Sequence, residues 1–207
     1  MSEPRLYRGQ SIEDRRLDRR RRFCESGLAL FGTAGFAATS VATVCKHASL
    51  SSRQFYVEFD DRESLLRTIY DQIEDAASTK VEAAVTAAFE AGGNLDEVLD
   101  AGISVFVEHF AADPRRTRLC FVEVVGVSAE FERYRAERRT RWADLLSAVA
   151  SIGIDRGLIT EPADPLLWTG FIGAVNTITV AQSNSPELTS DDTLRAMRTL
   201  LHRGVLG

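Results

Sequence analysis

The feature that most constrains the fold is the spacing of apolar residues, which recur every three or four positions through most of the chain. Residues 95–112 give a clear case, and their apolar positions are Leu95, Val98, Leu99, Gly102, Ile103, Phe106 and Phe110. Such spacing places one apolar stripe along an α-helix. No segment shows sustained strand alternation, and the β-branched run VEVVGV (residues 122–127) has no second strand to pair with. The sequence therefore predicts an all-α fold of about nine helices.

Polar residues with capping spacing mark where helices begin. Ser51 and Gln54 can form a capping box, in which two side chains each accept a hydrogen bond from a backbone N–H group of the first turn. Asp60 and Glu63 repeat this spacing and predict the start of a long helix that continues to Phe89. Two short helices before that long helix therefore fall within about residues 39–59.

The charge of the chain is unevenly distributed. Residues 1–62 hold eleven Lys and Arg against eight Asp and Glu, a balance of +3, whereas residues 63–207 have a balance of −8. A basic front end on an acidic body is compatible with a segment that binds a polyanion. A solvated arginine-rich helix explains the same asymmetry about as often, in particular for Arg15, Arg16, Arg19 and Arg20.

The remaining composition favours a cytoplasmic protein without a cofactor. Cys24, Cys45 and Cys120 are odd in number and have no CxxC spacing, so each reads as a small buried residue in a reducing compartment. The three histidines are scattered singly, which predicts no metal site. No apolar window approaches the eighteen residues of a membrane span, so no membrane partner is expected.

Residues 39–59 have the pattern of a helix-turn-helix. Its second helix must lie in the major groove of DNA, which requires apolar residues between the helices and polar residues outside. Phe55 and Phe59 supply the apolar anchors. The predicted outward positions are Ser52, Arg53, Gln54 and Val57. Arg53 can bind guanine with two hydrogen bonds, Gln54 can pair with adenine, and the Tyr56 hydroxyl is suited to a phosphate.

Residues 23–66 resemble the DNA-binding domain of the tetracycline-repressor-like (TetR) family of bacterial transcriptional regulators. The matching positions are Leu30-Phe31, Gly35-Phe36, Thr39, Val44-Cys45, Ala48-Ser49-Leu50-Ser51, Phe55-Tyr56, Phe59 and Arg62-x-x-Leu65. The resemblance implies that Thr39 and Tyr56 contact phosphate and that Arg62 takes the place of the family's lysine. The complete set expected at double-stranded operator DNA is Thr39, Ser51, Ser52, Arg53, Gln54, Tyr56 and Arg62.

Two positions depart from the family pattern. Ser49 replaces the glycine usual in the turn, where a left-handed backbone costs a non-glycine residue roughly 1–2 kcal/mol. Cys45 stands where alanine is common, but a cysteine is also small and apolar. Neither change removes a group that faces DNA.

The resemblance also implies a division into domains. Residues 1–10 are expected to be a flexible tail, 11–60 the helix-turn-helix domain, and 61–207 a ligand-binding and dimerisation domain. The candidates for a pocket that takes a small apolar or amphipathic effector are Phe106, His109, Phe110, Phe121, Trp142, Trp168, Phe171 and Asn176. Such pockets are mostly apolar with few polar groups, although an aromatic residue is more often plain core.

A homodimer is expected because one short recognition helix makes too few base contacts for useful specificity. Two final helices, at about residues 165–183 and 190–204, occupy the place where the family builds its interface. The interface candidates are Ala174, Val175, Ile178, Leu194, Met197 and Leu201, and packing within one protomer is an equally good explanation for each.

Catalysis is not expected, and no catalytic residue is assigned. The chain has no Ser/His/acid arrangement, no glycine-rich phosphate loop and no HExxH sequence. The prediction is a DNA-binding regulator, most simply a repressor released by its effector. The alternatives are a helical protein-interaction module and a regulator that has no small-molecule ligand.

Overall fold

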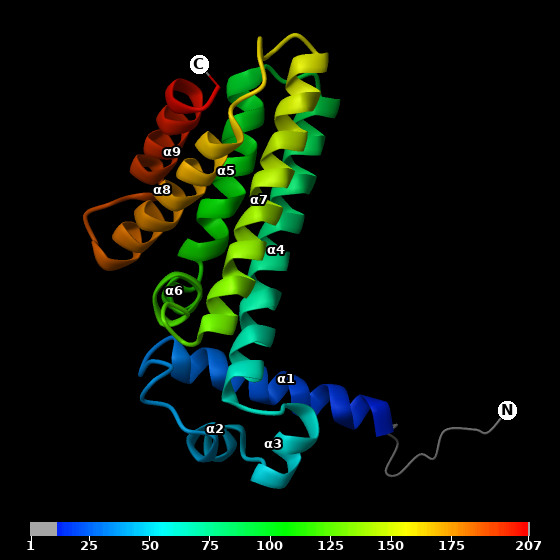
Figure 1. The fold of residues 1–207 in the computed structure, drawn as a ribbon, viewed down its shortest axis with the longest axis vertical. Helices are drawn as coiled ribbons and strands as arrows, with labels where there is room; N and C mark the ends of the chain where they lie inside the picture. The colour runs from blue at the N-terminus through cyan, green and yellow to red at the C-terminus, as the bar shows by residue number, and fades with distance from the viewer. Residues whose placement is uncertain (1–11, 207) are drawn as a thin grey trace, which may run out of the picture.

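The computed structural model describes residues 12–206, and this part of the chain contains α-helices, one π-helical segment and no strand (Figure 1). The elements in order are α1 (Ile12–Phe31), α2 (Val41–Ala48), α3 (Ser52–Glu58), α4 (Arg62–Glu90), α5 (Leu95–Ala111), α6 (Pro114–Arg118), η1 (Leu119–Glu123), α7 (Ala129–Asp155), α8 (Pro165–Asn184) and α9 (Ser190–Gly204). The predicted all-α class with nine helices is confirmed for this range. The predicted tail at residues 1–10 lies outside the described residues.

Helices α1, α2 and α3, together with the start of α4, form a small head at one end of the molecule (Figure 1). Its centre is aromatic: Phe23 and Phe55 are fully buried and meet edge to face with ring centroids 5.3 Å apart. Phe59 joins them at 6.1 Å from Phe23 and 5.6 Å from Phe55. Edge-to-face rings gain more than their buried area alone provides, so this cluster fixes α3 against α1.

The arginines of α1 complete the attachment of α3. The carboxylate of Glu58 is fully buried and accepts hydrogen bonds from Arg19 at 2.9 and 3.1 Å. Arg20 donates to the backbone oxygen of Glu58 at 2.9 Å and stacks over the Phe59 ring. Neither Arg19 nor Arg20 is therefore the simple solvated charge that the sequence left open, because a buried carboxylate at the end of α3 holds them inside the head.

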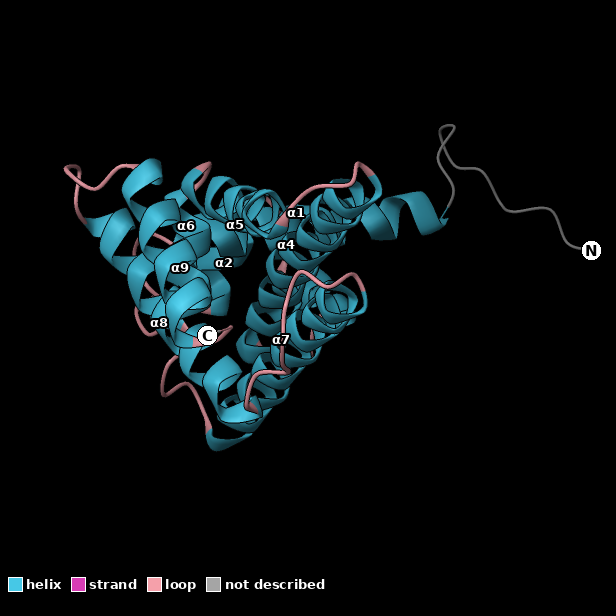
Figure 2. Cartoon of the chain, turned by 90° about the horizontal axis from the view of Figure 1, so that it is seen from above, coloured by secondary structure: helices cyan, strands magenta, loops and turns pink. Residues whose placement is uncertain are grey.

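The larger body contains the rest of α4 with α5, α7, α8 and α9. Seen from above (Figure 2), α8 and α9 lie on one side and α4 with α7 on the other. Helix α5 packs against both α4 and α9, and α7 packs against α8. Because α4 runs from the head through the full height of the body, it connects the two parts as one continuous helix (Figure 1).

Most helix starts agree with the capping residues predicted from the sequence. The Ser51–Gln54 capping box forms as expected. The box predicted for Asp60 and Glu63 is wrong by one position, because Asp61 and Ser64 form it instead. Asp60 precedes the helix, and the Glu63 carboxylate is used elsewhere: it accepts a hydrogen bond from Ser128 at 2.9 Å.

Two backbone positions explain how closely the head packs. Ser49 has φ 52° and ψ 43°, so it adopts the left-handed conformation expected at this turn despite its side chain. Arg22 donates to the backbone oxygens of Ala48 and Ser49, which holds this strained turn in place. At Gly27 a Cβ atom would lie 2.5 Å from the Ile69 side chain, so α1 and α4 approach as they do only because residue 27 has no side chain.

Candidate DNA-reading surface and ligand cavity

The outer face of α3 carries exposed polar, apolar and aromatic residues. Ser52 and Arg53 are exposed, and Tyr56 and Val57 are 60% and 67% exposed. The Tyr56 ring also contacts the buried Phe55 ring, with the two centroids 5.4 Å apart and the rings edge to face. An α-helix with such an exposed face fits the width of a DNA major groove.

Three of the other residues predicted to bind DNA make contacts inside the head. The Gln54 side chain accepts hydrogen bonds from the Ser51 backbone N–H and hydroxyl, at 2.9 and 3.0 Å. Thr39 is 1% exposed, and its hydroxyl donates to Gly35 O at 2.8 Å. Arg62 lies over the Phe36 ring and donates to the backbone oxygens of Phe36 and Thr39. Direct DNA contacts by these side chains remain predictions.

The start of α2 offers two exposed hydroxyl groups that the sequence reasoning did not select. Ser40 caps α2 by accepting from the Thr43 N–H at 3.1 Å, and the two hydroxyls lie 2.8 Å apart. Both residues are exposed beside buried Thr39. The sequence did contain a signal for this cap. Ser40 and Thr43 are three residues apart, as are Ser51 and Gln54 at the start of α3.

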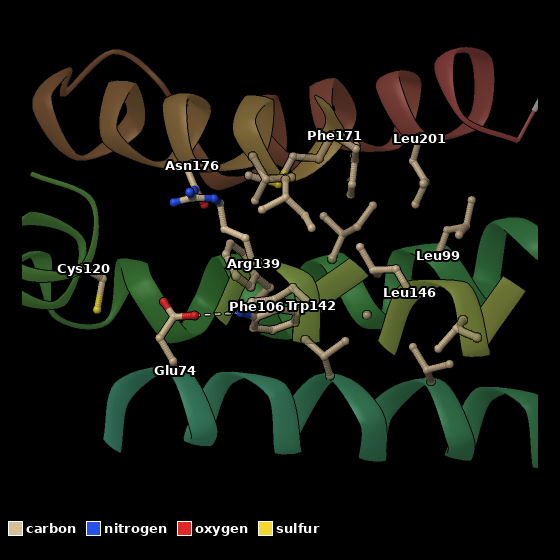
Figure 3. A pocket seen from close by; sticks show the side chains of 18 of the residues that line it. Glu74, Leu99, Phe106, Cys120, Arg139, Trp142, Leu146, Phe171, Asn176 and Leu201 are labelled. Carbon is tan, nitrogen blue, oxygen red and sulfur yellow. Dashed lines mark hydrogen bonds between the residues drawn. The ribbon is translucent and has the colours of Figure 1, made fainter. Parts of the chain in front are cut away.

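A cavity lies inside the body between α4, α5, α7, α8 and α9 (Figure 3). Its empty volume is about 980 Å³ when the opening to solvent is included. Most of its wall is apolar and comes from Val81, Val85, Val98, Leu99, Ile103, Phe106, Phe121, Trp142, Leu146, Val149, Phe171, Ile172, Val175, Met197 and Leu201. The polar residues of the wall are Tyr70, Glu74, Cys120, Arg135, Arg139 and Asn176.

Some of the predicted pocket residues line this cavity and others do not. Those in its wall are Phe106, Phe121, Trp142, Phe171 and Asn176. The wall does not include Phe110, which packs behind it with its ring centroid 4.9 Å from those of Phe106 and Phe121. Trp168 is likewise buried, in the core that α8 shares with α9. Aromatic content alone does not distinguish a cavity wall from the layer behind it.

His109 also lies outside the cavity wall, because its ring is used between helices. Its Nε2–H donates to the backbone oxygen of Ile73 at 3.1 Å, and its Nδ1 accepts from the Lys80 ammonium at 3.3 Å. Burial, with the positive charges of Arg116 and Lys80 nearby, lowers the pKa of His109. The ring is therefore a neutral link between α4 and α5.

Glu74 is a buried carboxyl group in the cavity wall that the sequence reasoning missed. It is 4% exposed and accepts a hydrogen bond from Trp142 Nε1 at 2.7 Å (Figure 3). Burial raises its pKa, since a charge is poorly solvated there. The available signal was an acidic residue on the apolar stripe of α4, between Tyr70 and Ala77.

The π-helical segment η1 contacts both the cavity and the head. Cys120 and Phe121 are in the cavity wall. Two residues further, the Glu123 carboxylate accepts a hydrogen bond from the Phe36 N–H of the head at 2.7 Å. Gly35 has φ +99°, and a Cβ atom there would lie 3.0 Å from Glu123, so glycine allows this close approach. A five-residue segment thus joins the cavity wall to the loop before α2.

The predicted dimer residues fall into two groups. Met197 and Leu201 are buried inside the protomer and, with Val175, line the cavity. For these three the structure gives packing within the protomer, the alternative that the sequence left open. Ala174, Ile178 and Leu194 are partly exposed. The most exposed apolar surface here was not predicted: Leu166 is 75% exposed and begins a stripe with Gly170, Gly173 and Thr177 along α8.

No helix among residues 12–206 is long and apolar enough to cross a membrane. A head with an exposed helix-turn-helix on a helical body with an internal cavity defines a class of protein, the helix-turn-helix transcriptional regulators.

Comparison with known proteins narrows this class. Residues 24–69 match the family model described as bacterial regulatory proteins, tetR family. The chain is 23% identical over 185 residues to the HTH-type transcriptional regulator EthR of Mycolicibacterium smegmatis, across 89% of this chain and 83% of that protein. The head of this chain therefore matches the DNA-binding domain of the tetR family, and the similarity to a helix-turn-helix transcriptional regulator extends over most of the chain.

Solved structures share the fold at low sequence identity. The fatty acid degradation regulator FadR from Bacillus halodurans superposes with a TM-score of 0.78 at 14% identity, over 88% of this chain and 94% of that one. The transcriptional regulator FadR from Bacillus subtilis, in complex with stearoyl-CoA, gives a TM-score of 0.74 at 16% identity, over 88% and 95%. Because these superpositions cover 88% of this chain, the shared fold includes the body as well as the head.

Proposed function

We propose that this protein is a repressor that binds operator DNA as a homodimer and leaves it when a small apolar or amphipathic effector enters the cavity. The observation that carries the proposal is η1, because it lines the cavity and also holds the head through Glu123 and Phe36 N–H. An effector that displaces Phe121 favours a different position of the head. A ligand can shift the equilibrium between two such states only by its difference in affinity for them.

The DNA side of the proposal rests on the exposed face of α3. Arg53 and Tyr56 are the residues that we assign to base and phosphate, because both are exposed and neither side chain has a hydrogen bond within the described part of the chain. Ser51 and Gln54 support that face by capping it. Residues 11–60 then form the reading domain, although the aromatic core of the head also includes Leu65 and Leu66 of α4.

The dimer side rests on α8 and α9. Leu166, Gly170, Gly173 and Thr177 form one exposed stripe at helical spacing, and Leu200 on α9 is 41% exposed. Small residues on such a stripe let two helices approach closely, and partly exposed Ala174, Ile178 and Leu194 are available at its margin. A dimer places two recognition helices on one DNA site, as repressors with helix-turn-helix motifs require.

The effector side is supported by the cavity and by one structural relative. The wall is mostly apolar, and the B. subtilis FadR of the same fold is described in complex with stearoyl-CoA, an amphipathic molecule. We therefore favour an elongated amphipathic effector over a small polar one. Residues 61–207 form the domain that would hold this effector and the second protomer.

The test begins with genomic selection of binding sites, followed by gel-shift measurement of affinity and of the number of protomers bound. The double variant Arg53→Ala with Tyr56→Phe should raise the Kd for the selected site by at least about 100-fold, because each good contact contributes about 1–3 kcal/mol of discrimination. The circular dichroism spectrum of the double variant should match that of the wild-type protein, which shows that the fold is intact.

The control is Arg133→Ala, which removes an exposed charge on α7. Wild-type affinity in the double variant would refute the assignment, and one protomer per site would refute the dimer.

A further inference from the structure

Arg139 is a charged residue in the cavity wall that forms no ion pair within the described part of the chain, although the charge of Glu132 lies near enough to interact with it. Two other arginines of α7 are paired: Arg135 contacts Glu132 at 2.9 Å, and Arg138 contacts Asp75 at 2.7 Å. For Arg139, no carboxylate among residues 12–206 lies within 4.0 Å, and its side chain makes no hydrogen bond there. Yet the residue is only partly exposed and borders a mostly apolar space. A charge in such a place is costly unless something pairs with it.

The amide of Asn176 is the labelled polar group that lies nearest the Arg139 guanidinium in Figure 3. The guanidinium of Arg139, on α7, extends across the cavity toward Asn176, on α8. Asn176 is also partly buried, and its side chain has no hydrogen-bond partner among the described residues. Two side chains with N–H donors, from different helices, thus lie at the same end of the cavity, and neither makes a hydrogen bond among the described residues.

The cavity changes character along its length. In Figure 3, Arg139, Asn176, Glu74 and Cys120 lie toward one end. Leu99, Leu146 and Leu201 lie toward the other, together with the aromatic ring of Phe171. This distribution suits a molecule with one polar end and one extended apolar part.

The acidic residue at the polar end is separated from Arg139 and Asn176. Glu74 lies on the opposite wall, on α4, where its carboxyl group accepts a hydrogen bond from Trp142 Nε1. Burial raises the pKa of this carboxyl group. The positive groups in the cavity wall are Arg135 and Arg139 of α7.

We propose that the cavity binds an aliphatic carboxylate, whose head group pairs with Arg139 and Asn176 and whose chain extends toward Leu99, Leu146 and Leu201. A planar guanidinium matches a carboxylate through two parallel hydrogen bonds. The Asn176 amide supplies a third donor, and the apolar wall removes the chain from water. This inference rests on the proposed function in one respect, because the bound carboxylate would be the effector that releases the repressor.

The experiment is isothermal titration calorimetry on the full chain without DNA, with dodecanoate below its micelle concentration as the probe. Dodecan-1-ol, which has the same chain without the charge, and lauroyl-CoA, which has the same chain on a large anionic carrier, are the comparison ligands. Wild-type protein should bind dodecanoate more tightly than dodecan-1-ol. In Arg139→Gln the Kd for dodecanoate should rise roughly 10- to 100-fold, the range expected when a charged hydrogen-bond donor is lost.

The matched control is Arg133→Gln, which removes an exposed arginine from the same helix outside the cavity wall. It should leave the Kd for dodecanoate within about twofold, and Arg139→Gln should do the same for dodecan-1-ol. Asn176→Ala gives a second, smaller loss specific to dodecanoate. Equal binding of acid and alcohol by wild-type protein, or equal losses for both in Arg139→Gln, would overturn the proposal.

Two further outcomes also overturn it. One is the absence of dodecanoate binding, and the other is Arg139-dependent binding of lauroyl-CoA without binding of dodecanoate, which would assign the site to an acyl thioester. Because these titrations contain no DNA, they are independent of the operator test. A protein that binds dodecanoate but no operator keeps the cavity assignment and loses the proposed function, and the reverse result does the opposite.

Discussion

The head and the body of this protein are built from the same kind of helix but differ in how completely they are packed. In the head, Phe23, Phe31 and Phe55 are fully buried, and arginines of α1 contact the buried carboxylate of Glu58. In the body, α4, α5, α7, α8 and α9 surround a mostly apolar cavity that opens to solvent. A reading head must hold one geometry, whereas a ligand-binding body must keep room for another molecule. The filled aromatic core of the head and the cavity of the body agree with these two roles.

The largest expected effect is in the head. Phe55→Ala removes a fully buried ring at the centre of the aromatic cluster and should lower the free energy of unfolding by about 3–5 kcal/mol. Chemical denaturation followed by circular dichroism measures this loss. The control is Val57→Ala on the same helix, which is 67% exposed and should change stability by less than about 0.5 kcal/mol. Similar losses in both variants would mean that α3 is not anchored as described.

A smaller effect is expected for a comparable truncation in the body. Leu146→Ala enlarges a space that is already empty, and Leu146 is only partly buried. Its cost should stay near about 2 kcal/mol, the low end for such changes. The same denaturation experiment measures it. A loss as large as that of Phe55→Ala would show that the cavity wall is packed as tightly as the head, and the comparison would fail.

The smallest effect concerns Glu74 and depends on pH. Because burial raises its pKa in the folded protein above the ordinary 4.5, the folded state binds the proton more tightly than the unfolded state. The stabilisation that this proton provides is complete below pH 4.5 and is lost as the pH rises through the folded-state pKa. Glu74→Gln keeps the acceptor for Trp142 Nε1 without the ionisation.

The variant should therefore gain stability relative to wild type as the pH rises from 4.5 toward neutrality, measured by thermal unfolding across that range. Glu137→Gln, an exposed change on α7, should show no such trend. A flat difference for Glu74→Gln would indicate that the carboxyl group remains solvated, and the polar end of the cavity would then be open to water.

The sequence by itself determined the fold class, most helix boundaries and the face of α3. These features follow from local rules: apolar spacing, and capping pairs such as Ser51 with Gln54, act within a few residues. The error at Asp60 shows the limit of these rules. Asp60 with Glu63 and Asp61 with Ser64 have the same spacing, so the sequence offers two registers for one capping box. In the structure the second register forms, and the Glu63 carboxylate instead accepts a hydrogen bond from Ser128, the residue that caps α7.

The tertiary structure decided which side chains remain free. Thr39, Gln54 and Arg62 are polar and fall at positions expected to face DNA, yet each is engaged within the head. Met197 and Leu201 have the pattern of an interface and turn inward to the cavity. A local pattern shows which residues share one face of a helix. Which other part of the protein packs against that face depends on residues far away in the chain. Arg138 and Arg139 give a clear case: the two arginines are adjacent in sequence, and packing of α7 against α4 gives Arg138 an ion pair with Asp75 but places Arg139 in the cavity wall.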